Sequence, residues 1–117
     1  MPDVPDQQSA EAAVRQEGEA LLRQWPADGM VVAVNLHGRA YDSEAFAVQL
    51  ERWLEQGGSR LTFVIAGSNG FSPAVLARAG ARISLSPLTF PHQLTRLILA
   101  EQVFRACKIN RNETYHK

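Results

Sequence analysis

Hydrophobic residues along this chain fall into short continuous runs that alternate with longer amphipathic stretches. The runs lie at residues 30–36, 61–66 and 83–85, and the first two are mostly apolar without alternation. Such runs are typical of strands buried on both faces of a parallel sheet. Helices are expected around them, at residues 9–24, 43–56, 73–79 and 92–107. This alternation of helix and strand predicts an α/β fold around a parallel sheet.

Polar residues mark the expected starts of the helices. Ser9 is a candidate N-cap of the first helix, and either Asp42 or Ser43 caps the second. Pro73 stands at the favoured first position of the third helix. Residues 1–8 contain two prolines, two aspartates and little to bury, so we expect them to be disordered. The inward face of the second helix is predicted to consist of Phe46, Leu50, Trp53 and Leu54.

Three loops follow the predicted strands directly, at residues 37–41, 67–71 and 86–91. Ligands of open parallel sheets bind outside the carboxyl ends of the strands. Two glycines, Gly67 and Gly70, let the backbone of the second loop approach a ligand closely. Their spacing lacks the third glycine of a dinucleotide fingerprint and the lysine of a phosphate-binding loop. The three loops therefore indicate a binding site without identifying its ligand.

The last predicted helix is apolar around most of its circumference. Its apolar residues are Leu94, Leu97, Ile98, Leu99, Val103, Phe104 and Cys107. Such a helix is covered on most sides, which a chain of 117 residues can hardly achieve alone, so we expect a subunit interface. Glu101 falls on the side of Leu94 and Leu97, and it can pair with Arg105 four residues later. This pair is either an internal ion pair or part of a functional site.

Length and composition narrow the class of protein. The length of 117 residues suggests one domain, which we place at residues 9–117. The single cysteine, Cys107, excludes an internal disulfide and a cysteine-rich zinc site, and the three histidines lack metal-ligand spacing, so no metal is predicted. No run reaches the ~18 apolar residues of a membrane span, and the N-terminus does not resemble a secretory signal. A cytoplasmic protein without membrane contact is therefore expected.

The formal net charge of zero conceals an uneven distribution. Residues 1–77 carry five Lys or Arg against ten Asp or Glu, whereas residues 78–117 carry seven against two. A basic half is compatible with nucleic-acid binding, although scattered surface charge is the commoner cause. The last residues, Tyr115, His116 and Lys117, combine an aromatic ring, a group that titrates near neutrality and a cation. Such a tail suits contact with RNA.

Three segments of the sequence together resemble one known family. VIAGSNGF, ISLSPLTFPHQLTRLILAEQVFRACKI and the terminal YHK are similar to the RlmH family, the SPOUT-class methyltransferases that act on pseudouridine in large-subunit 23S ribosomal RNA. The resemblance covers roughly residues 17–117 and is densest from Phe63 onward. It implies a parallel-sheet α/β fold of SPOUT type with a C-terminal trefoil knot. It also implies a homodimer whose knots bind S-adenosylmethionine.

The resemblance also implies which residues form the site. By motif position the cofactor would contact Val34, Ala66, Gly67, Leu85, Ser86, Pro87, Leu88, Thr89 and Phe90. The catalytic or RNA-contacting set would be His92, Glu101, Arg105, Tyr115 and His116. The implied reaction transfers a methyl group to nitrogen 3 of pseudouridine, with the tail of one subunit near the cofactor of the other. Which residue acts as the base is left open.

The sequence departs from the family pattern at several places. Family members carry a further strand–helix–strand segment before the first helix, so the fold is expected to be shortened at its N-terminus. Ala66 stands where a glycine is usual, Asn35 where an acidic residue is common, and Arg39 where a lysine is common. These departures motivate a second hypothesis, a truncated, non-catalytic remnant that dimerises with or without cofactor binding. A third hypothesis, independent of the family resemblance, is a small α/β nucleotide-binding or regulatory module that uses the three loops.

Overall fold

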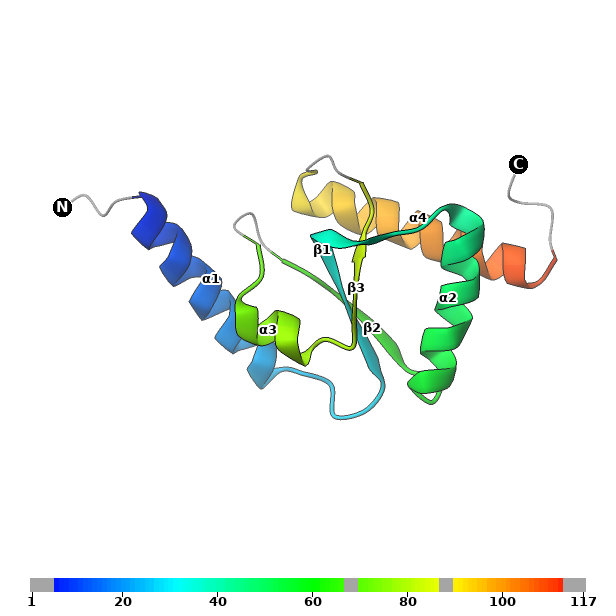
Figure 1. Ribbon diagram of the computed structural model, residues 1–117, viewed down its shortest axis with the longest axis horizontal. Helices are drawn as coiled ribbons and strands as arrows, with labels where there is room; N and C mark the ends of the chain where they lie inside the picture. The colour runs from blue at the N-terminus through cyan, green and yellow to red at the C-terminus, as the bar shows by residue number, and fades with distance from the viewer. Residues whose placement is uncertain (1–5, 67–69, 87–89, 113–117) are drawn as a thin grey trace.

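The computed structural model describes residues 6–66, 70–86 and 90–112 (Figure 1). Their elements, in chain order, are α1 (Asp6–Arg23), β1 (Met30–Ala40), α2 (Ser43–Gln56), β2 (Leu61–Ile65), α3 (Pro73–Arg78), β3 (Ala81–Ser84) and α4 (His92–Asn110). Within the described ranges the strands form one three-stranded sheet in the order β2-β1-β3, and both pairings are parallel. The predicted α/β class with a parallel sheet is thus confirmed.

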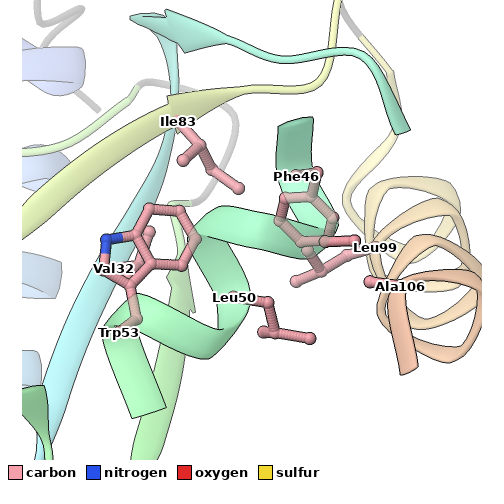
Figure 2. Packing of buried hydrophobic residues seen from close by; sticks show 8 residues of the cluster. Val32, Phe46, Leu50, Trp53, Ile83, Leu99 and Ala106 are labelled. Carbon is pink, nitrogen blue, oxygen red and sulfur yellow. The ribbon is translucent and has the colours of Figure 1, made fainter. Parts of the chain in front are cut away.

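Helices cover both faces of the sheet, as the unbroken apolar runs predicted. On one face, Val32 and Ile83 pack with Phe46, Leu50 and Trp53 of α2, and with Leu99 and Ala106 of α4 (Figure 2). On the other face, Val31, Ala33 and Val64 pack with Trp25, Phe71, Leu76 and Ala79 from the α1 and α3 side. Since neighbouring residues of β1 point to opposite faces, a central strand can be apolar throughout only when both faces are covered.

Two predicted helix starts are confirmed by their caps. The Asp42 carboxylate accepts a hydrogen bond of 2.7 Å from the backbone N–H of Ala45, and α2 begins at Ser43. The Ser72 hydroxyl accepts one of 3.3 Å from Val75 N–H, with Pro73 at the first position of α3. Both bonds satisfy backbone donors that the first turn of a helix leaves without a partner.

The first helix starts earlier than the sequence indicated. α1 begins at Asp6, so the assignment of Ser9 as its N-cap is wrong, and residues 6–8 of the segment expected to be disordered are helical. The residues concerned, Asp-Gln-Gln, are compatible with a first helical turn. Glutamine has good helix propensity, and an aspartate near the N-terminus complements the helix dipole.

The loop expected at residues 37–41 is for the most part a continuation of β1. Val34 and Arg39 both pair with Ile83, so β1 is irregular between them and resumes its pairing with β3 up to Ala40. Gly38 makes this possible, because a β-carbon at its position would lie 2.6 Å from the backbone carbon of Ile83. A glycine within a strand often marks such a close backbone approach.

The C-terminal helix is longer than predicted and only partly covered. α4 continues three residues beyond Cys107 to Asn110, whose side-chain amide donates a hydrogen bond of 3.0 Å to the Ala47 carbonyl of α2. Leu99 and Ala106 are buried against α2 and the sheet. Large apolar side chains also point outward: Leu94, Leu97 and Phe104 are 43%, 66% and 51% exposed. Within one chain, the side of the helix that carries Leu94, Leu97 and Glu101 is therefore not buried.

Candidate active site at the carboxyl edge of the sheet

The carboxyl ends of β2 and β3 lie on either side of Val34 in the central strand β1, which itself continues to Ala40. Val34 of β1 pairs with Ile65 of β2 on one side and with Ile83 of β3 on the other. Ala66 follows β2 directly, and Leu85 follows the last residue of β3. The convergence of the predicted loops on one edge therefore follows from the strand register. Pairing in parallel sheets places the ends of neighbouring strands together.

The predicted cofactor residues that the structure describes share one kind of environment. Half-buried side chains are found at Val34, Ala66, Leu85, Ser86 and Phe90. The other predicted cofactor residues, Gly67, Pro87, Leu88 and Thr89, lie outside the described residues. So do Tyr115 and His116 of the predicted catalytic set. The trefoil knot stays a prediction, because it depends on the path of the chain through residues 87–89.

Glu101 and Arg105 form the ion pair that their spacing predicted. The guanidinium of Arg105 donates two hydrogen bonds to one carboxylate oxygen of Glu101, from Nη2 at 2.7 Å and from Nε at 3.1 Å. Their side chains are 25% exposed for Arg105 and 37% for Glu101. His92, another residue of the predicted catalytic set, is the first residue of the same helix. The pair is thus held along α4 and remains accessible from one side.

A glutamine that the sequence analysis missed extends this pair toward α2. The Gln102 amide donates a hydrogen bond of 2.9 Å to the second carboxylate oxygen of Glu101. Its own carbonyl oxygen accepts one of 3.1 Å from the Ser43 hydroxyl at the start of α2. Gln102 follows Glu101 directly in the sequence, and nothing in its spacing marks it as functional. Only the packing of α4 against α2 brings Ser43 to it.

Residues of α2, β3 and α4, with the residues that follow β1 and β3, line a partly open cavity of about 350 Å³. Its walls include Tyr41, Ser43, Phe46, Ile83, Leu85 and Gln102. The cavity lies where the start of α2, the end of β3 and the middle of α4 come together. It is therefore next to the carboxyl edge of the sheet.

The part of the chain that the structure describes contains neither a metal site nor a membrane span. No three His, Cys, Asp or Glu residues among those described are grouped so that they could hold a metal ion. None of the described helices has the length and apolar character needed to cross a membrane. Cys107 is a free cysteine that is partly buried and packs against the core cluster containing α2 and α4 residues.

Comparison with known proteins identifies the family. The family described as "Predicted SPOUT methyltransferase" matches residues 2–116 of the chain. A protein of Exiguobacterium sibiricum named "Ribosomal RNA large subunit methyltransferase H" is 43% identical, over 98% of this chain and 77% of its own length. A protein of the same name from Listeria monocytogenes is 46% identical over the same shares. The chain therefore belongs to the SPOUT methyltransferase family, in its RlmH branch.

Proposed function

We propose that this protein is an S-adenosylmethionine-dependent methyltransferase of 23S ribosomal RNA that modifies nitrogen 3 of a pseudouridine. Two relatives are named as large-subunit ribosomal RNA methyltransferases, which supports the choice of substrate. The observation that carries the proposal is the register of the sheet, in which Val34 pairs with both Ile65 and Ile83. This register brings the three family-predicted cofactor segments to one edge.

The residues at this edge fit the proposed cofactor. Val34, Leu85 and Phe90 offer partly accessible apolar surface, and β2 and β3 both end beside Val34 at this edge. Adenine and a thioether chain need apolar walls with a few backbone hydrogen bonds, which this arrangement can provide. S-adenosylmethionine supplies an electrophilic methyl group when it is bound. Ala66, where the family resemblance implies a glycine, adds one methyl group at this edge.

The ion pair on α4 is assigned to positioning of the substrate. Its two hydrogen bonds to one oxygen fix the orientation of the Arg105 guanidinium relative to Glu101. A guanidinium held in this way favours planar contacts with phosphate or with a base. His92, Tyr115 and His116 complete the proposed set around the target nucleotide. Nitrogen 3 must lose its proton for the methyl group to be accepted, so one group of this set, or water held by it, acts as the base.

The active form is proposed to be a cytoplasmic homodimer. The support is the exposed apolar surface of α4 formed by Leu94, Leu97 and Phe104. Exposed apolar patches of this kind often mark protein–protein interfaces. A two-fold contact would cover this surface on both subunits. In the proposed dimer the C-terminal tail of one subunit lies near the cofactor of the other, as the family resemblance implies. A small protein of zero net charge would then recognise the large subunit, or the assembled ribosome, by shape more than by charge.

Isothermal titration of S-adenosylmethionine into the purified protein tests the proposal, after sedimentation has established the oligomeric state. Saturable binding near one site per subunit is expected. A folded dimer that binds no S-adenosylmethionine would contradict the assignment of the carboxyl edge. Tight binding of ATP or NAD in its place would favour a nucleotide-binding module.

A further inference from the structure

The cavity beside the carboxyl edge is separate from most of the proposed cofactor site. Of the described residues assigned to the cofactor, Leu85 alone lines it. Its volume of about 350 Å³ lies at the small end of the range for ligand sites, which is roughly 300–1,000 Å³. A space of this size suits one base with its ribose better than a dinucleotide.

The walls combine apolar surface with an oriented amide. Phe46, Ile83 and Ile98 supply the apolar part, which can cover the face of a base. The amide of Gln102 has two donor hydrogens and two acceptor lone pairs. Its hydrogen bonds to Glu101 and from Ser43 use one of each, and the described residues leave one of each for a further partner. A primary amide with a donor and an acceptor side by side matches the edge of a nucleobase.

One wall of the cavity is an aromatic residue, Tyr41, whose ring has a cation beside it. Tyr41 lines the cavity, and its ring is held edge-on by Trp53 at 6.2 Å between centroids. The exposed guanidinium of Arg39 lies 5.2 Å from the centre of the Tyr41 ring. Asp42 also lines the cavity, but its carboxylate caps α2 through Ala45 N–H. Of these groups, Arg39 supplies the cation that a phosphate would contact.

We propose that this cavity binds one unstacked nucleotide of the RNA substrate, with its base between Tyr41 and Gln102 and its phosphate at Arg39. Proteins that read single-stranded RNA commonly combine an aromatic or arginine plane with hydrogen bonds to the base edge. The identification of the ligand as RNA rests on the proposed function. Since Gln102 also donates to Glu101, an occupied cavity would fix the carboxylate that orients Arg105. Binding of one nucleotide in the cavity would thus orient Arg105 toward the neighbouring target nucleotide.

Nuclear magnetic resonance tests this assignment with uridine 5′-monophosphate as the probe. The nucleotide is titrated into ¹⁵N-labelled protein, first free and then saturated with S-adenosylhomocysteine. Saturable shifts are expected at the Gln102 side-chain amide and at Ser43 in both states. Gln102→Leu should raise the dissociation constant of the nucleotide about fivefold, the effect of losing one or two neutral hydrogen bonds. Gln56→Leu, at the exposed end of α2, is the matched control and should leave it unchanged.

Several results would overturn the assignment. Absence of saturable shifts at Gln102 would do so, as would equal weakening by both leucine variants. Competition between the nucleotide and S-adenosylhomocysteine, with shifts centred on Val34 and Ala66, would assign the cavity to the cofactor. If Gln102→Leu does not fold, Ser43→Ala replaces it, because it removes the hydroxyl that orients the Gln102 amide and changes the cavity wall by one oxygen atom only. It should likewise weaken binding of the nucleotide, and unchanged binding would count against the assignment. If the protein binds no S-adenosylhomocysteine, the proposed function is contradicted. The titration of the nucleotide into the protein without S-adenosylhomocysteine still tests the role of the cavity.

Discussion

Replacing Gly38 by alanine should destabilise the protein because the added methyl group has no space. A β-carbon at this position would lie 2.6 Å from the backbone carbon and 2.7 Å from the backbone nitrogen of Ile83. Both atoms belong to a buried strand residue that is 1% exposed, so no flexible side chain can move aside. Overpacking of this kind costs about 1–3 kcal/mol, and the upper value of about 3 kcal/mol is expected here because the added methyl group meets backbone atoms. The reduced entropy of the unfolded alanine chain offsets only about 0.4–1 kcal/mol.

Urea unfolding at a fixed protein concentration measures this cost. With a slope of about 1–2 kcal/mol per molar for a chain of this size, a net loss of about 2 kcal/mol lowers the midpoint by about 1–2 M. Gly58→Ala is the matched control, because its position has a φ of +62° and nothing within 4 Å of the added carbon. The control should lose only about 1 kcal/mol from backbone strain. The Gly58→Ala control should also leave the affinity for S-adenosylmethionine unchanged. Gly38→Ala should displace β3 beside Val34 and thereby weaken the binding of S-adenosylmethionine. A Gly38→Ala variant with the wild-type midpoint and affinity would refute the reasoning.

Four further substitutions test separate parts of the structure. Asp42→Ala should lower the free energy of unfolding by about 1 kcal/mol, measured by urea denaturation, because the N-cap bond to Ala45 is lost. Leu97→Asp should convert a dimer to monomers in sedimentation velocity, since a buried unpaired charge costs roughly 3 kcal/mol or more, whereas Val48→Asp, which also replaces an exposed apolar residue, should not. Glu101→Gln should lower kcat for ribosome methylation about 100-fold by releasing Arg105, with unchanged calorimetric affinity for S-adenosylmethionine. His116→Ala should abolish methyl transfer while cofactor binding persists, and normal turnover would remove His116 from the mechanism.

Local signals in the sequence were sufficient for much of the fold. The unbroken apolar run containing Val31 and Val32 indicated a strand covered on both faces, and the structure places these two residues in different core clusters. The cap at Asp42 and the helix start at Pro73 depend on local chemistry, so their prediction needed no tertiary information. The ion pair between Glu101 and Arg105 likewise follows from helical spacing alone.

Features that depend on tertiary contacts could not be predicted from the sequence alone. Gly38 reads as a loop residue in the sequence, and its role in a strand becomes evident only when the backbone of Ile83 lies against it. Gln102 gained significance through Ser43, which is fifty-nine residues away and becomes its partner through the packing of α2 on α4. Arg39 acquires a role from its position over Tyr41. Such juxtapositions arise from helix and strand packing, which periodicity does not encode.

The central claim is methyl transfer to ribosomal RNA, and a direct transfer assay tests it. Purified protein is incubated with tritium-labelled S-adenosylmethionine and with large subunits or ribosomes from cells that lack the modification. Stoichiometric incorporation is predicted, and mass spectrometry of nuclease fragments should locate the methyl group on nitrogen 3 of a pseudouridine. Failure to incorporate any label, by a folded dimer that binds S-adenosylmethionine, would contradict the claim and favour a non-catalytic member of the family.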